Sequence, residues 1–128
     1  MFISEESSKK DSLGNLLSPN SLALQFAFEQ LDLKQQDMPF HAGEIYLQTI
    51  TAMLYADFDF MGTLIFLTNY GRDNDTTAAV AGGILGAFYG FEELPKEDRE
   101  KVLKVNREIL VIDLEKMASD LTAHMIGK

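Results

Sequence analysis

Residues 71–90 read Gly71-Arg72-Asp73-Asn74-Asp75-Thr76-Thr77, followed at once by Ala78-Ala79-Val80-Ala81-Gly82-Gly83-Ile84-Leu85-Gly86-Ala87-Phe88-Tyr89-Gly90. The first part is a glycine-marked turn that carries two carboxylates and a hydroxyl within four residues. The second part is rich in small and apolar residues and predicts a helix that ends at Gly90. Its glycines recur every four residues, so one face lacks side chains. We therefore expect another helix to lie close to that bare backbone.

Asp73, Asp75 and Thr76 carry hard oxygen donors, which Mg²⁺, Mn²⁺ and Ca²⁺ prefer as ligands. Asp, Asn and Thr are also common N-cap residues, whose side-chain oxygens accept free backbone N–H groups of the first turn. A cap alone and a cap combined with a metal site are both open interpretations. An EF-hand is excluded, because its loop needs Gly at the sixth position and Glu at the twelfth, where this chain has Ala78 and Ile84.

The length of 128 residues and a hydrophobic share of 46% predict one globular domain. Residues 1–18 are polar and have no apolar period, so we expect a flexible lead-in there and a single all-α domain over residues 19–128. Asn20 or Ser21 is expected to cap the first helix, with a connection over residues 34–42.

A second helix is predicted over residues 44–55, with an inward face formed by apolar side chains at roughly helical spacing. These side chains are Ile45, Leu47, Ile50, Met53 and Leu54. Asp57 is expected to cap a third helix that runs to Asn69 and is apolar at nearly every position, which predicts burial on most sides.

Two further helices are predicted after the glycine-rich one. Pro95 is expected in the first turn of a charged helix. Asp113 is expected to cap the last helix, with Leu114, Met117, Ala118 and Leu121 directed inward.

The net charge of −9 argues against a nucleic-acid duplex as partner, because phosphate neutralisation needs a basic patch. The chain has no cysteine, so it has no disulfides and fits a reducing compartment. No apolar run is long enough to span a membrane, and the start of the chain lacks the pattern of a secretory signal. We therefore expect a cytoplasmic protein that does not enter a membrane.

The segment Asp73-x-Asp75-Thr76, followed by a small-residue helix that closes in Gly86-Ala87-Phe88-Tyr89-Gly90, resembles the ADP-ribosylglycohydrolase family. This family includes dinitrogenase-reductase-activating glycohydrolase and J1 crystallin. The resemblance extends loosely over residues 44–121 and corresponds to the C-terminal part of the family fold. It implies a compact all-α fold of several helices, with this segment at the start of a helix.

The resemblance also implies a binuclear Mg²⁺ centre, with Mn²⁺ as an alternative. The implied reaction is hydrolysis of the N- or O-glycosidic bond between ADP-ribose and a protein side chain, so ADP-ribose or an ADP-ribosylated protein is the implied partner. Asp73, Asp75 and Thr76 would be metal ligands. Tyr70, Gly71, Arg72 and Thr77 are the candidates for substrate binding or support, and no catalytic residue is assigned.

The chain departs from the family pattern in two ways. Arg72 stands where better-known members often have Gly. Family members are also much longer, and their N-terminal half carries a Thr/Ser-Asp-Asp run that supplies the remaining metal ligands. This sequence has no Asp-Asp pair. We therefore expect little or no hydrolase activity from this chain alone.

A non-catalytic interpretation stands beside the enzymatic one. A truncated relative could keep the helical scaffold and act as an interaction module. The apolar helix over residues 57–69 and the bare glycine face would then be covered by a second copy, as a homodimer. A complementary chain that supplies the N-terminal half is a third arrangement.

Overall fold

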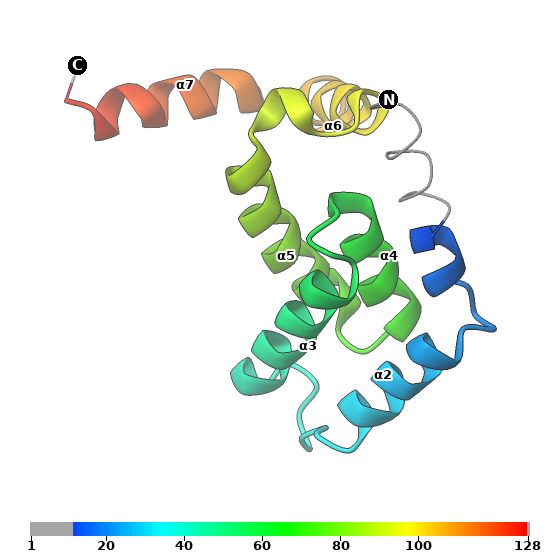
Figure 1. Cartoon of the computed structure of the whole chain (residues 1–128). Coiled ribbons are helices and arrows are strands. Elements are labelled where there is room, and N and C mark those ends of the chain that lie inside the picture. Colours follow the sequence, from blue (N-terminus) through cyan, green and yellow to red (C-terminus); the bar gives the residue numbers. More distant parts are fainter. Residues whose placement is uncertain (1–11, 128) are drawn as a thin grey trace. The chain divides into compact units, whose positions relative to one another are not determined.

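Helices account for all regular structure in residues 12–127, the part of the chain that the computed structural model describes (Figure 1). This confirms the all-α prediction. The contacts divide the chain into two compact units, Met1–Phe88 and Tyr89–Lys128, and each is described by itself. The expectation of a single domain over residues 19–128 stays a prediction. Within residues 12–127, no helix combines the length and apolar composition needed to cross a membrane.

The first unit is built from α2 (Leu22–Asp32), α3 (Ala42–Tyr55), α4 (Phe60–Tyr70) and most of α5 (Asn74–Tyr89). The helix α3 packs against both α2 and α4 (Figure 1). Phe66 lies at the centre of the core and is fully buried. Its ring centroid is 5.0 Å from that of Phe28 and 5.1 Å from that of Tyr55, so aromatic contacts join α2, α3 and α4.

A short helical segment over residues 12–16 precedes α2, although the sequence analysis assigned residues 1–18 to a lead-in. Leu17 is buried in the core, and the Tyr55 hydroxyl donates to the Leu16 carbonyl over 2.9 Å. Residues 12–17 therefore belong to the first unit. Residues 1–11 lie outside the described residues.

Local capping bonds begin two of the helices as predicted. The Ser21 hydroxyl accepts from the Leu24 backbone N–H at the start of α2. The Asp113 carboxylate accepts from the Lys116 N–H at the start of α7, over 3.0 Å. Each bond satisfies a backbone donor that the helix itself cannot pair.

The predicted start of the third helix is wrong. Asp57 and Phe58 have φ values of 50° and 60°, which no right-handed helix can include. The cap of α4 is Asp59, whose Oδ2 accepts from the Gly62 N–H over 2.7 Å. Two left-handed residues thus turn the chain between α3 and α4 before the helix begins.

The helix α4 is buried on one side only, in contrast to the expected burial on most sides. Gly62, Thr63, Phe66 and Leu67 are buried, whereas Met61 and Ile65 are exposed. At Gly62 an added Cβ would lie 2.8 Å from the Leu13 Cδ2. The absence of a side chain at this position lets the segment before α2 approach α4.

The inward face of α3 also differs from the prediction. The buried residues of α3 are Glu44, Gln48, Thr49, Ala52 and Met53. Of the expected inward side chains, Leu47 and Leu54 are exposed. The polar side chains of Glu44 and Gln48 face the interior of the first unit because they have hydrogen-bond partners there.

The glycine-rich helix ends as predicted, since α5 stops at Tyr89 and Gly90 adopts φ 83°. The expected close backbone approach is wrong at Gly82. An added Cβ there would meet only the end of the Leu64 side chain, at an ordinary distance of 3.9 Å. A side chain of α4 therefore covers this position in place of a bare backbone.

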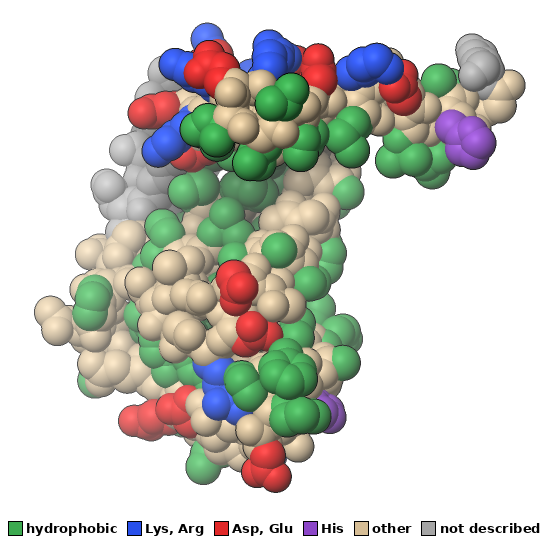
Figure 2. Space-filling view, turned by 180° about the vertical axis from the view of Figure 1, so that it is seen from behind, with side chains coloured by type: hydrophobic (Ala, Val, Ile, Leu, Met, Phe, Trp, Pro, Cys, Tyr) green, Lys and Arg blue, Asp and Glu red, His purple; other side chains and the backbone are tan. Residues whose placement is uncertain are grey.

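The second unit contains the 3-10 turn η1 (Phe91–Glu93), α6 (Lys96–Glu108) and α7 (Leu114–Met125). The helices α6 and α7 contact each other, but neither has a buried residue. Met117 and Leu121 are exposed, so the prediction that they point inward is wrong. Two helices alone enclose no core within this unit. Figure 2 shows acidic and basic side chains interspersed over it.

A buried carboxylate joins three segments of the first unit. The Glu44 side chain, 2% exposed, forms an ion pair with Arg72, which follows α4 directly. Glu44 also accepts from the Gln36 backbone N–H over 2.8 Å and from the Gln48 Nε2 over 2.9 Å. The hydrogen bond from Arg72 holds the pKa of Glu44 below its usual value, although burial acts in the opposite direction.

We predict that Phe66→Ala lowers the free energy of unfolding by about 3–5 kcal/mol, because truncation leaves a cavity among three helices. Urea denaturation followed by circular dichroism measures the change. Leu22→Ala is the control, since Leu22 is 80% exposed, and should change stability by less than about 0.5 kcal/mol. Equal losses in both variants would contradict the central position of Phe66.

The lowered pKa of Glu44 predicts a pH dependence of stability. Its contribution is present above the unfolded pKa, near 4.5, and is lost as pH falls through the lower folded pKa. Between about pH 5 and pH 3, the urea midpoint of the wild type should therefore fall more steeply than that of Glu44→Gln. Glu29→Gln, which removes an exposed carboxylate of α2, should parallel the wild type. Identical slopes in wild type and Glu44→Gln would contradict the prediction.

Candidate functional site

The carboxylate-bearing turn lies between α4 and α5, as the sequence analysis predicted. Gly71 ends α4 with φ 85°, and Asp73 follows with φ 49°. Left-handed backbone is favourable for Gly, and Asp tolerates it better than most residues. The Asp73 carbonyl then accepts the Thr77 N–H over 3.1 Å, which is the first backbone bond of α5.

The structure brings Asp73 and Thr76 together. The Thr76 hydroxyl donates to the Asp73 Oδ1 over 3.2 Å. The partner of this carboxylate oxygen is a side-chain hydroxyl, so the contact differs from a simple N-cap bond to the backbone. Asp75 lies in the first turn of α5 and is exposed. The spacing of two thus leaves one carboxylate partly buried and the other in solvent.

The second carboxylate oxygen of Asp73 is buried and has no hydrogen-bond partner within residues 12–127. Burial of an unpaired carboxylate oxygen is costly, and such an atom in a protein calls for an explanation. The Asp73 carboxylate and the Thr76 hydroxyl therefore place two hard oxygen donors together, which is the kind of ligand that divalent cations prefer. Within the same residues, no three His, Cys, Asp or Glu side chains converge on one point.

The candidate ligand-lining residue Tyr70 is held by its neighbours. Its hydroxyl donates to the Asp32 Oδ1 over 2.9 Å and accepts from the Gln35 Nε2 over 3.1 Å. Its ring centroid lies 5.2 Å from that of Phe28. Burial is the main reason why the pKa of Tyr70 is raised above its usual value. Tyr70 therefore links the end of α4 to the end of α2.

The other candidate residues also make structural contacts. Arg72 pairs with Glu44 and donates to the Gln36 carbonyl. Thr77 is fully buried, and its hydroxyl lies within 3.3 Å of the Asp73 carbonyl. These placements support the shape of the turn. The assignment of Tyr70, Gly71, Arg72 and Thr77 to substrate binding stays a prediction.

The sequence pattern did not point to Glu44, the partner of Arg72, or to Gln48, which donates to Glu44. The available signal was their spacing, since Glu44, Gln48 and Ala52 lie four residues apart and all three are buried. Two polar side chains on the same helical face as a buried alanine can mark a paired charge inside the protein.

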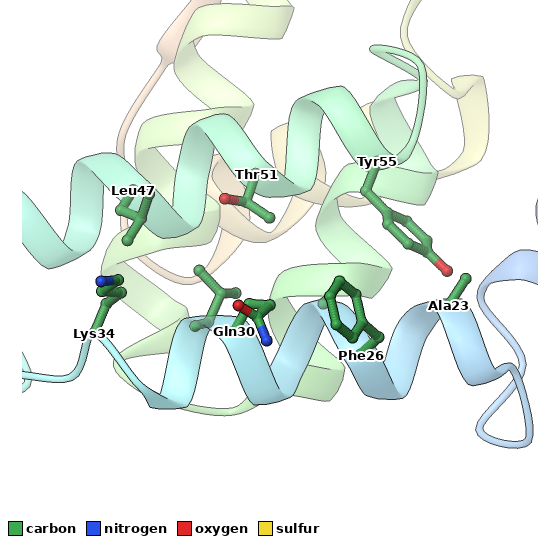
Figure 3. A pocket seen from close by; sticks show the side chains of 9 residues that line it. Ala23, Phe26, Gln30, Lys34, Leu47, Thr51 and Tyr55 are labelled. Carbon is green, nitrogen blue, oxygen red and sulfur yellow. The ribbon is translucent and has the colours of Figure 1, made fainter.

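A groove of about 540 Å³ lies elsewhere in the first unit, between α2 and α3 (Figure 3). Phe26 and Tyr55 flank one part of it, and Lys34 and Leu47 flank another. None of the candidate site residues lines this groove. No feature of the sequence predicted this groove.

Comparisons with known proteins agree with the motif. The sequence profile of the family described as ADP-ribosylglycohydrolase matches residues 5–128. ADP-ribosyl-[dinitrogen reductase] glycohydrolase of Rhodospirillum rubrum is 39% identical over 64 residues, which are 49% of this chain and 22% of that protein. ADP-ribosylhydrolase ARH3 of Mus musculus is 50% identical over 34 residues, which are 27% of this chain and 9% of that protein.

The matched stretches thus span less than a quarter of either relative. No solved structure matches the chain. The family profile nevertheless covers nearly the whole chain and agrees with the helical fold and with the resemblance at residues 71–90. By this match, the chain belongs to the ADP-ribosylglycohydrolase family.

Proposed function

We propose that Asp73, Asp75 and Thr76 supply part of a Mg²⁺ or Mn²⁺ centre for hydrolysis of the glycosidic bond between ADP-ribose and a protein side chain. The observation that carries this proposal is the buried Asp73 Oδ2, which has no hydrogen-bond partner within residues 12–127, while the Oδ1 of the same carboxylate accepts from the Thr76 hydroxyl. Family membership and the names of both relatives, which are ADP-ribosyl hydrolases, support the substrate class.

The residues of this chain have the following roles in the proposal. Asp73 and Thr76 orient oxygen donors toward the cation, and Asp75 adds a second carboxylate from the first turn of α5. The buried Thr77 holds the Asp73 carbonyl in place. A bound divalent cation supplies electrostatic stabilisation of charge at the ribose and offsets repulsion between the pyrophosphate and this acidic chain.

We further propose that this chain on its own holds only one of the two ligand clusters that the reaction needs. It has no Asp-Asp pair, and no three acidic, His or Cys side chains converge within residues 12–127. The other ligands would come from a complementary N-terminal half. Full activity would therefore require both parts.

A second candidate function is a helical interaction module that forms a homodimer. It is favoured by exposed aliphatic side chains on neighbouring turns of α4 and α5. These are Met61, Ile65, Val80 and Ile84. Apolar side chains scattered singly are normal on protein surfaces, whereas a contiguous exposed patch is typical of a contact surface, and the proposed dimer requires that these four side chains form such a patch.

Calorimetric titration with Mg²⁺ and Mn²⁺ tests the metal site. We expect saturable binding by the wild type and at least about a tenfold loss of affinity in Asp73→Asn/Asp75→Asn, because both carboxylate ligands are removed. Asp59→Asn/Asp113→Asn is the matched control. It also removes two negative charges, but at the N-caps of α4 and α7, where Asn can replace Asp as the cap. Circular dichroism confirms that each variant is folded.

Two results would contradict the proposal. If the folded wild type binds neither Mg²⁺ nor Mn²⁺, the motif has only a structural role in the turn before α5. Hydrolysis of ADP-ribosylarginine by the purified chain, abolished by Asp75→Asn, would show that the chain needs no second cluster.

Sedimentation equilibrium distinguishes the second candidate. If α4 and α5 form a homodimer contact, the wild type should sediment as a dimer of about 28.6 kDa, twice the chain mass of 14.3 kDa. Ile65→Lys/Ile84→Lys should then shift it to the monomer, because charges would be buried at the contact. A wild type that stays monomeric at high concentration would rule the dimer out.

A further inference from the structure

Glu44 is a buried charged residue that pairs with Arg72, the residue immediately before Asp73. Its side chain is almost inaccessible to solvent and accepts hydrogen bonds from three segments. The donors are the Gln36 backbone, the Gln48 side chain and the Arg72 guanidinium. The proposed function uses none of these groups, so the reason for burying a carboxylate at this position needs a separate explanation.

Arg72 connects this carboxylate to the candidate site. It is the residue immediately before Asp73, and it stands between two left-handed residues, Gly71 and Asp73. Its guanidinium contacts Glu44 and the Gln36 carbonyl at once. The side chain of Arg72 therefore anchors a short turn whose backbone has little regular hydrogen bonding of its own.

The orientation of Asp73 depends on that turn. Its carbonyl accepts the first backbone bond of α5, and its Oδ1 accepts the Thr76 hydroxyl. A shift at Arg72 would move the adjoining peptide and with it the direction of both Asp73 groups. A buried carboxylate strongly opposes such a shift, because losing the arginine would leave the charge unpaired.

We propose that Glu44 is a positioning residue for Asp73 and Thr76, and that it acts through Arg72. This rests on the proposed metal site between those residues. Groups behind a first ligand shell commonly fix ligand orientation, and their loss weakens metal affinity. Here the group behind the ligands is an ion pair that joins α3 to the turn before α5.

Two variants and two readouts test the proposal. Glu44→Gln removes the charge, and Arg72→Lys keeps the charge but loses the planar fork that reaches two acceptors. If Glu44→Gln does not fold, Arg72→Lys still tests whether the ion pair positions Asp73. Tyr55→Phe is the matched control, because it removes one hydrogen bond from the same unit, to the Leu16 carbonyl, away from the turn.

The first readout is amide hydrogen exchange of the metal-free chain, resolved by residue. We expect faster exchange at Thr77, whose N–H bonds to the Asp73 carbonyl, in Glu44→Gln and Arg72→Lys. Thr63, whose N–H bonds to the Asp59 carbonyl at the start of α4, reports general destabilisation and should change little. The control variant should leave the ratio of the two rates unchanged.

The second readout is Mn²⁺ affinity by calorimetry. We expect a loss of about 10- to 100-fold in Glu44→Gln and a smaller loss in Arg72→Lys. Thr77 exchange that is unchanged, or that rises only together with Thr63, would overturn the positioning role. If the wild type binds Mn²⁺, faster exchange at Thr77 with an unaltered Mn²⁺ affinity in both variants would overturn it as well.

The two proposals can fail separately. A wild type that binds no Mn²⁺, but whose Thr77 exchange depends selectively on Glu44 and Arg72, would refute the metal site in this chain. The same result would support the action of Glu44 on the turn.

Discussion

The ion pair between Glu44 and Arg72 sets the arrangement of the first unit around its candidate site. A carboxylate in the interior must be paired and hydrogen-bonded, because desolvation otherwise makes it strongly unfavourable. Glu44 meets this requirement with donors from the connection after α2, from α3 and from the turn after α4. These three segments are consequently held together by one side chain. The glycine and aspartate with left-handed backbone on either side of Arg72 then determine how α5 starts.

Features that depend on neighbours in the sequence could be predicted. The caps Ser21 and Asp113, the turn at Gly71 and the stop at Gly90 each involve residues within a few positions. Glu44 and Arg72 are 28 residues apart in the sequence, so the periodicity of apolar residues could not predict that they pair. For the same reason the inward face of α3 was misassigned, because tertiary partners outweighed hydrophobic pattern. The start of α4 was missed because Phe58, unlike Gly or Asp, belongs to a residue type that rarely adopts the left-handed backbone found there.

The candidate site residues could be named from the sequence, but their environment could not, and their assignment to a metal site stays a prediction. The donors Asp73, Asp75 and Thr76 could be named from their chemistry, and the contact between Asp73 and Thr76 follows from their spacing of three. Sequence could not show that one oxygen of Asp73 is buried and, within residues 12–127, has no hydrogen-bond partner while Asp75 faces solvent. Burial depends on how α4 and α5 pack, and it gives the two carboxylates different electrostatic surroundings despite their identical chemistry.

The exposed aliphatic side chains of α4 and α5 have a consequence for the colloidal behaviour of the protein. At neutral pH the net charge of −9 opposes non-specific association of molecules by mutual repulsion. Near the isoelectric point, about 4.5, that repulsion vanishes. Solubility should therefore reach its minimum in mildly acidic solution. Added salt at neutral pH should lower solubility as well, because it screens the repulsion between the charged molecules.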